Sequence, residues 1–159
     1  MKSTFLQIKK IECKSYVIHP SKHKVMKPLN LSIILFILIA FGSYSARATG
    51  WYNSYWFTDV ILHSISGIMF GFFWLWYMRN LKIQNVWFQV ITIVTFATFA
   101  SVLWEFWEFA GHYITPNHTQ YYIPDLGDTL NDILCGMLGS TIVSFYVFLN
   151  SKRESKRML

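Results

Sequence analysis

Four long apolar runs, separated by short polar segments, dominate the hydrophobic pattern of the chain. A helix needs about 20 residues, at roughly 1.5 Å rise each, to cross the hydrocarbon layer of a membrane. Each run reaches or approaches that length. The pattern therefore predicts an all-α polytopic membrane protein, a four-helix transmembrane bundle whose spans cover about residues 28–45, 56–78, 86–110 and 129–150.

The composition agrees with a membrane protein. Of 159 residues, 53% are hydrophobic and only 14% are charged, which differs from the average soluble domain. We expect residues 28–150 to form one transmembrane domain, with residues 1–27 as a basic cytoplasmic arm and 151–159 as a basic cytoplasmic tail. An Ala46-x-Ala48 pattern ends the first span and fits a signal peptidase site. The basic region before it is long for a signal peptide, so an uncleaved first span is expected.

The basic residues predict how the chain is oriented. Of 14 lysines and arginines, all but Arg47 lie before the first span, between the second and third spans, or after the fourth. Basic residues are retained on the cytoplasmic side of membrane proteins. Both termini are therefore expected in the cytoplasm, in a multi-pass protein of the inner (plasma) membrane whose immediate partner is membrane lipid.

The acidic residues are concentrated on the opposite side. Glu12 and Glu154 lie in the cytoplasmic segments, whereas six other acids fall at the outer ends of three spans. His63 accompanies them in the second span, and His112 lies just past the third. The resulting outer layer contains Asp59, His63, Glu105, Glu108, His112, Asp125, Asp128 and Asp132.

Sequence spacing places these residues on shared helix faces. Asp59 and His63 are four apart, Glu105 and Glu108 three apart, and Asp128 lies between Asp125 and Asp132 at intervals of three and four. Residues at such intervals line one side of a helix. Each of the three spans is thus expected to turn a polar stripe toward its neighbours. Small residues that permit close helix packing follow two of the stripes, namely Gly67, Gly71, Gly136 and Gly139.

Charge balance indicates a binding site in this layer. An ionised carboxylate at membrane depth costs several kcal/mol unless it is paired, protonated or metal-bound, and Arg47 alone cannot pair six acids. Shared protons, bound cations, a cationic substrate or water at the rim are the open alternatives. Oxygen and nitrogen ligands without thiolate suit zinc, manganese or iron. The predicted divalent-metal ligands are His63, Glu105, Asp132, Asp128, Asp59 and Asp125, with Glu108 as a catalytic base.

Some of these residues have structural alternatives. Asp128 is placed to cap the start of the last helix, and Asp59 to cap the second span. Asp125 fits a solvated loop carboxylate, and Glu108 a carboxylate at the wet interface. His63, Glu105 and Asp132 lie deeper in their spans, where ionisable residues are functional by default.

The motifs "TDVILHSISG", "LWEFWEF" and "PDLGDTLNDILCGMLGS" together resemble the YjdF-like family of uncharacterised bacterial inner-membrane proteins, and more distantly the VanZ-like membrane proteins. The similarity covers roughly residues 56–145. It implies that the family's acid–histidine, Glu-x-x-Glu and Asp-x-x-Asp-x-x-x-Asp patterns fall on Asp59 and His63, on Glu105 and Glu108, and on Asp125, Asp128 and Asp132. The family implies no particular reaction.

Three functions fit the sequence. The first is an outer-side metal site acting on a lipid-linked substrate; the second is a small cation-binding or proton-coupled transporter; the third is a non-catalytic membrane scaffold. A homo-oligomer is the candidate protein partner. Nucleic-acid binding is not expected, because the basic residues are divided among cytoplasmic segments instead of gathering on one face. Nucleotide-binding, serine-hydrolase and dinucleotide motifs do not occur.

Overall fold

The computed structural model describes residues 27–114 and 126–157, except for the side chains of residues 52, 53, 112, 113, 154, 155 and 157. This part of the chain is helical and contains no strand. Its elements are α1 (Pro28–Ala48), α2 (Trp51–Ser54), α3 (Phe57–Asn80), α4 (Val86–Ile114) and α5 (Leu126–Arg157). Four of them, all but α2, are long and apolar enough to cross a membrane, which confirms the predicted all-helical class and the number of spans.

The helices extend beyond the apolar runs that predicted them. α5 begins at Leu126 instead of residue 129 and continues to Arg157, through most of the segment expected as a tail. α4 likewise reaches Ile114. Hydropathy detects only the residues that must lie in hydrocarbon, whereas helical hydrogen bonding continues into polar sequence at no cost to membrane insertion. The polar ends of α4 and α5 are for this reason invisible to a hydropathy pattern.

A tight turn joins α3 to α4. Lys82 adopts a left-handed conformation with φ of 56°, its N–H donates to the Arg79 carbonyl, and the N–H of Ile83 donates to the carbonyl of Met78. This is the hydrogen-bond pattern of a Schellman helix end. Asn85 then caps α4, because its side-chain oxygen accepts from the N–H of Phe88 at 3.1 Å. The two helices are thereby fixed antiparallel.

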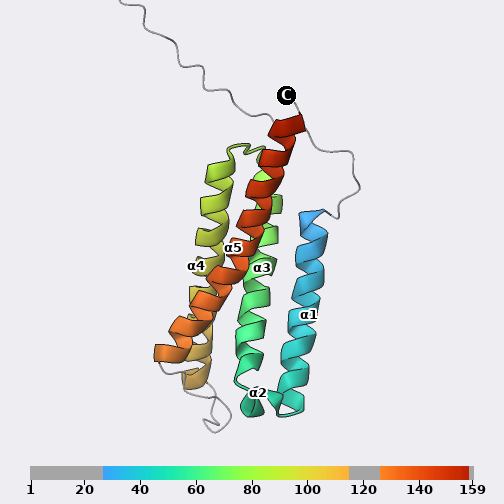
Figure 1. Ribbon diagram of the computed structural model, residues 1–159. Coiled ribbons are helices and arrows are strands. Elements are labelled where there is room, and N and C mark those ends of the chain that lie inside the picture. The colour runs from blue at the N-terminus through green and yellow to red at the C-terminus, as the bar shows by residue number, and fades with distance from the viewer. Residues whose placement is uncertain (1–26, 115–125, 158–159) are drawn as a thin grey trace, which may run out of the picture.

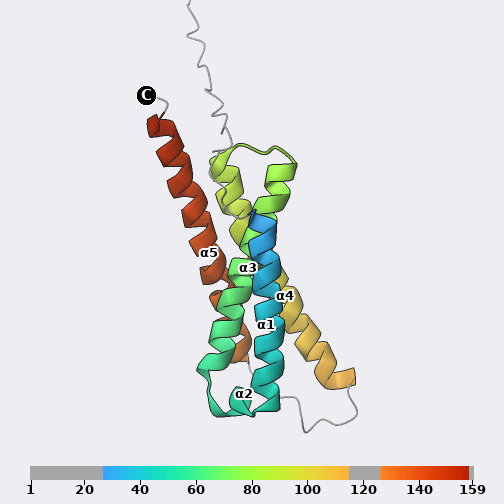
Figure 2. The same cartoon turned by 90° about the vertical axis from the view of Figure 1, so that its right-hand side faces the viewer.

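The core of the bundle consists of α3, α4 and α5. α5 leans across the other two helices and contacts both (Figures 1 and 2). This three-helix core contains an apolar cluster in which four side chains are buried, those of Leu75, Ile93, Val143 and Val147. The Ser144 hydroxyl adds a bond between helices, donating to the Val90 carbonyl at 3.1 Å. Interhelical hydrogen bonds of this kind contribute about 0.6–2 kcal/mol in membranes.

Close backbone approach sets how deeply α5 packs into α3. A Cβ added at Gly67 would collide with the backbone of Gly136, and one added at Gly139 would collide with the carbonyl of Ser64. Association of membrane helices relies on such van der Waals contact, since lipid is as apolar as the side chains. These glycines therefore determine the separation of α3 and α5 just beyond the layer of acidic residues and His63.

α1 lies at the edge of the bundle. Within the described residues it contacts only α3 and the short α2, on the side of α3 away from α4 (Figure 1). Gly50, with φ of 75°, makes the turn from α1 into α2. Figure 1 also shows that α1 starts, and α5 ends, at the same end of the bundle as the α3–α4 turn. The α2 turn lies at the opposite end.

Candidate functional site

A polar cluster is located near the α2 end of the bundle, and His63 is at its centre. Asp59 is in the first turn of α3, and His63 follows one turn later on the same face. The Nε2 atom of His63 lies 3.4 Å from Asp59 Oδ1. The predicted capping role of Asp59 does not apply, because Trp56 is the N-cap position and has no side-chain cap bond.

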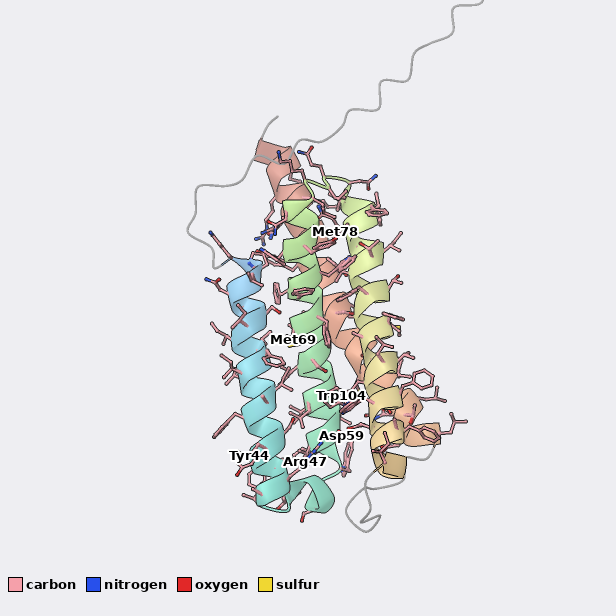
Figure 3. The ribbon with its side chains drawn as sticks, turned by 180° about the vertical axis from the view of Figure 1, so that it is seen from behind. Tyr44, Arg47, Asp59, Met69, Met78 and Trp104 are labelled. Carbon is pink, nitrogen blue, oxygen red and sulfur yellow. The ribbon has the colours of Figure 1, made fainter. Side chains whose placement is uncertain are left out.

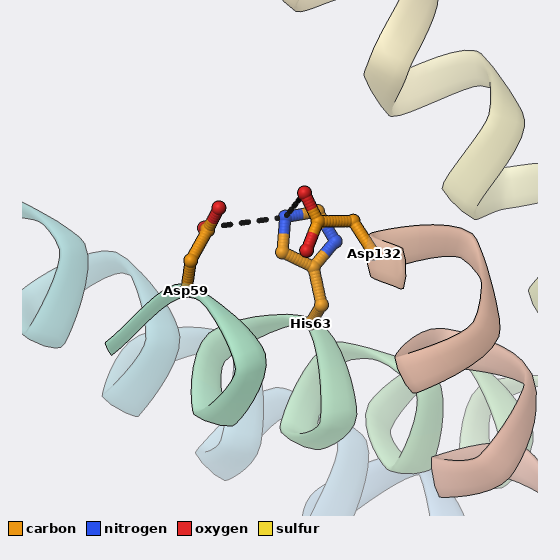
Figure 4. A group of neighbouring side chains, drawn as sticks. All are labelled: Asp59, His63 and Asp132. Atoms are coloured by element: carbon orange, nitrogen blue, oxygen red, sulfur yellow. Dashed lines mark ion pairs between the residues drawn. The ribbon is translucent and has the colours of Figure 1, made fainter. Parts of the chain in front are cut away.

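The second carboxylate at this imidazole comes from α5. Asp132 Oδ2 lies 3.9 Å from the same Nε2 atom of His63, so that the ring stands between acids of two different helices (Figure 4). Asp132 is only 2% exposed and His63 only 6%. The contact depends on the close α3–α5 packing at Gly67 and Gly139, which brings the first turns of α5 against the first turns of α3.

α4 contributes two further acids. Glu105 and Glu108 stand three residues apart on one face of this helix, and both reach toward His63. Glu105 is 7% exposed, while Glu108 is half-buried. Two groups of ligand-type side chains result, Asp59–His63–Asp132 and His63–Glu105–Glu108, each with ligand atoms within 4.8 Å of one another. His63 belongs to both groups.

Several buried carboxylate oxygens in this cluster have no hydrogen-bond partner among the described residues. They are both oxygens of Glu105 and the Oδ1 atom of Asp132. The Thr129 side chain lies beside Glu105 without completing a hydrogen bond to it. A buried polar atom left unsatisfied costs about 1–3 kcal/mol, and more when it is charged. The cluster thus carries acceptor atoms that the fold itself does not use.

The spacing of the ligand atoms fits a metal ion. Bonds of about 2.0–2.2 Å from zinc to nitrogen and oxygen place neighbouring ligand atoms about 3.3–3.6 Å apart at tetrahedral angles. The His63–Asp59 distance of 3.4 Å lies in that range, and the His63–Asp132 distance of 3.9 Å is slightly wider. Imidazole with carboxylates is the donor set found for zinc, manganese and iron. The residues present fit such an ion with small side-chain adjustments.

The other predicted site residues lie elsewhere. Asp128 is half-buried in the first turn of α5 and is in neither group, although it lies within electrostatic range of Asp132. It is not the N-cap, because α5 already begins at Leu126. A carboxylate in a first helical turn interacts favourably with the helix dipole. Asp125 and the side chain of His112 are outside the described residues.

Two neighbours of the cluster were not predicted as site residues. Thr129 precedes Asp132 by three residues and so shares its face of α5, which the sequence spacing alone would have indicated. Arg47, at the end of α1, is at the same end of the bundle as Asp59 (Figure 3) and within electrostatic range of Glu108. The charge pattern puts Arg47 on the same side as the six acids, but nothing in the sequence pairs it with Glu108 in particular, because the two helices are distant in the chain.

Comparisons with known proteins support a membrane protein. A family model described as "Predicted membrane protein (DUF2238)" matches residues 16–153. The predicted kinship to a family of uncharacterised membrane proteins is therefore confirmed, although the match does not carry the YjdF-like name. No curated protein matches the chain, and no solved structure does.

Proposed function

The chain belongs to the DUF2238 family of predicted membrane proteins, and we propose that it holds a divalent metal ion in the polar cluster centred on His63. The observation that carries the proposal is the buried, unpartnered state of both Glu105 oxygens and one Asp132 oxygen beside that imidazole. A helix bundle has no structural need for acceptors of this kind inside the membrane. A bound cation supplies the missing partner.

Charge supports a cation more than an ion-pair network. Four carboxylates surround one imidazole here, and Arg47 is the only lysine or arginine that the sequence offers on this side of the membrane. A divalent ion offsets two negative charges in the volume of one atom and orders its ligands at the same time. Zinc, manganese or iron is the proposed ion, because a nitrogen ligand disfavours calcium and magnesium.

We further propose that the metal serves chemistry on a lipid-linked substrate. A bound ion would polarise a phosphoryl or carbonyl oxygen and supply hydroxide at neutral pH. Glu108 is the proposed base, since it is the more exposed of the two glutamates and is placed to meet a substrate from outside the cluster. The apolar surface of the spanning helices lets a substrate anchored in lipid reach this depth by lateral diffusion.

The proposal places the site on the outer side of the inner membrane. The start of α1 and the end of α5 share the basic end of the bundle (Figure 1), and the positive-inside rule assigns that end to the cytoplasm. Residues 1–27, before the transmembrane domain 28–150 in the sequence, and residues 151–159, after it, would then both be cytoplasmic. The metal would face the extracytoplasmic space.

The metal content of the purified full chain tests the proposal. Elemental analysis after detergent extraction is expected to find near-stoichiometric zinc, manganese or iron in the wild type. His63→Ala removes the residue common to both ligand groups, and Glu105→Gln removes a charge at nearly constant volume, so both should lose the ion. His19→Ala combined with His23→Ala is the matched control for adventitious binding by histidines of the basic arm, and it should retain the metal.

Other outcomes separate the alternatives. A folded wild-type protein that purifies without metal, and binds none when titrated with zinc, manganese or iron, contradicts the proposed site. Dependence of a solute's transport on Glu105 and Asp132 in such a protein would then favour proton or cation exchange. An unchanged phenotype after joint replacement of Glu105, Glu108 and Asp132 would favour a scaffold.

A further inference from the structure

At the polar cluster, the first turns of α5 meet two different helices. Asp132 of α5 reaches the imidazole of His63 on α3, with 3.9 Å between Oδ2 and Nε2. Thr129 precedes Asp132 by three residues, so it lies on the same side of the helix, about one turn nearer the start of α5. The Thr129 side chain lies beside Glu105 of α4. α5 therefore brings a carboxylate to one neighbouring helix and a hydroxyl group to the other.

A ligand carboxylate at Glu105 needs a hydrogen-bond donor as well as an ion. Glu105 is 7% exposed, and neither of its oxygens has a hydrogen-bond partner among the described residues. An ionised carboxylate has two oxygens with about four acceptor positions, so a bond from one oxygen to an ion leaves the other oxygen unsatisfied. In metal sites, ligating carboxylates are themselves hydrogen-bonded to nearby groups, which hold them in the binding orientation.

The Thr129 hydroxyl is chemically suited to this role. Its O–H bond can rotate toward an acceptor, and Thr129 is half-buried, in surroundings where a hydrogen bond to a charged acceptor is stronger than in water. The structure places the hydroxyl beside Glu105 without completing the hydrogen bond. The donor and the acceptor are thus already neighbours, and orientation of the carboxylate is what the bond still requires.

We propose that Thr129 is a positioning residue of the metal cluster, whose hydroxyl donates to the Glu105 oxygen that the ion does not use. The proposal rests on the proposed metal site and adds to it a residue outside both ligand groups. Thr129 would orient the α4 ligand from α5, the helix that also supplies Asp132. Packing of its methyl group is the alternative role for a half-buried threonine. Valine has nearly the same shape without the hydroxyl, and therefore separates the two roles.

The test measures metal affinity and metal-free stability on the full chain in detergent. The metal is whichever of zinc, manganese and iron the purified wild type contains, titrated against a chromogenic chelator. Thr129→Val should lower the affinity by about 10–100-fold, as loss of a group that orients a ligand does, and should leave the unfolding temperature in excess chelator unchanged. Thr129→Ser keeps the hydroxyl and should restore the affinity. Thr98→Val, which removes a half-buried hydroxyl that donates to the Val94 carbonyl of its own helix at 2.9 Å, should bind the metal as the wild type does.

The outcomes distinguish the role of Thr129 from the metal site itself. A wild type that binds none of the three metals overturns the metal site, and the role of Thr129 with it. A wild type that binds metal no more tightly than Thr129→Val overturns the role of Thr129 alone. So does a lower unfolding temperature of Thr129→Val in chelator, or an equal loss of affinity in Thr129→Ser, because either result would show that the side chain acts through packing.

Discussion

At the residue scale, the environment of His63 is unusual for a side chain that serves packing alone. Its Nε2 atom faces Asp59 at 3.4 Å and Asp132 at 3.9 Å. Both distances exceed the 2.7–3.2 Å of an ordinary N–H···O hydrogen bond. An imidazole fixed by carboxylates for structural reasons would be expected closer to one of them. The spacing leaves room for the ion that we propose between the groups.

The two aspartates at the start of α5 should differ in their effect on metal binding. Asp132 belongs to a ligand group whereas Asp128 does not, so Asp132→Asn is expected to weaken metal affinity by more than tenfold and Asp128→Asn by less than twofold. Removing a residue that does not bind the metal typically lowers metal affinity 10–100-fold only when that residue orients a ligand. Competitive titration against a chromogenic chelator measures both. Equal losses would place Asp128 among the ligands.

Glu105 is expected to lower the stability of the metal-free protein. Its carboxylate is buried without a hydrogen-bond partner among the described residues, and a buried polar group left unsatisfied costs about 1–3 kcal/mol. Glu105→Leu is therefore expected to raise the unfolding temperature in the presence of a chelator while eliminating metal binding. Glu108→Leu, at a half-buried position, should change stability less. A large destabilisation by Glu105→Leu would show that the carboxylate supports the fold.

At the element scale, the geometry of the cluster depends on how closely α5 approaches α3. Asp132 precedes Gly136 by one turn, and His63 precedes Gly67 by one turn. Because Gly67 and Gly136 are in backbone contact, the residues one turn before them are held at the distance that lets an aspartate reach an imidazole. The helix packing and the polar site are thus one structural feature.

Alanine substitutions at Gly67 and Gly111 should change the stability of the protein in opposite directions. Gly67→Ala places a Cβ against the Gly136 backbone and should destabilise the protein by about 1–3 kcal/mol, the usual range for overpacking. It should also weaken metal binding, because Asp132 moves away from His63. Among the described residues, a Cβ added at Gly111 meets nothing within 4 Å, so Gly111→Ala should stabilise α4 by up to about 1 kcal/mol. Thermal unfolding in detergent measures both changes, and a neutral Gly67→Ala would contradict the close contact.

At the scale of the whole molecule, the chain has two chemically different ends. The end with the α3–α4 turn contains most of the basic residues of the described segments, whereas the α2 end contains the acidic cluster and Arg47 (Figures 1 and 3). α1 extends from one end to the other, and among the described helices it contacts only α3 and α2. The proposed metal cluster would accordingly act in the leaflet opposite to the basic end.

Cysteine labelling tests the proposed orientation. In a Cys13→Ser background, whose remaining Cys135 is buried, Ser54→Cys at the α2 end should react with a membrane-impermeant maleimide on intact cells. Asn85→Cys, in the α3–α4 turn, should react only after the cells are lysed. Both side chains are exposed, so the membrane alone decides the result. The reverse pattern would put the metal cluster on the cytoplasmic side.

The number of spans and the collection of acids in one layer were predictable from the sequence alone. The hydropathy and charge of a residue determine where it lies relative to the membrane plane. This plane is the same for every helix, so each residue's depth can be predicted from the local sequence. Membership in a shared helix face is local too, as the pairs Asp59–His63 and Glu105–Glu108 illustrate.

Only the tertiary structure decided which of these residues meet. Asp132 faces His63 and Asp128 does not, because glycine contacts fix the rotation and depth of α5 against α3. Arg47 lies at the same end of the bundle as Asp59 because of how α1 packs. An apolar groove lined by Ile33 and Phe73, among others, exists only where one face of α1 opposes one face of α3. Such contacts depend on helix rotation, tilt and separation, which are set by the packing of side chains distant in sequence and not by the membrane.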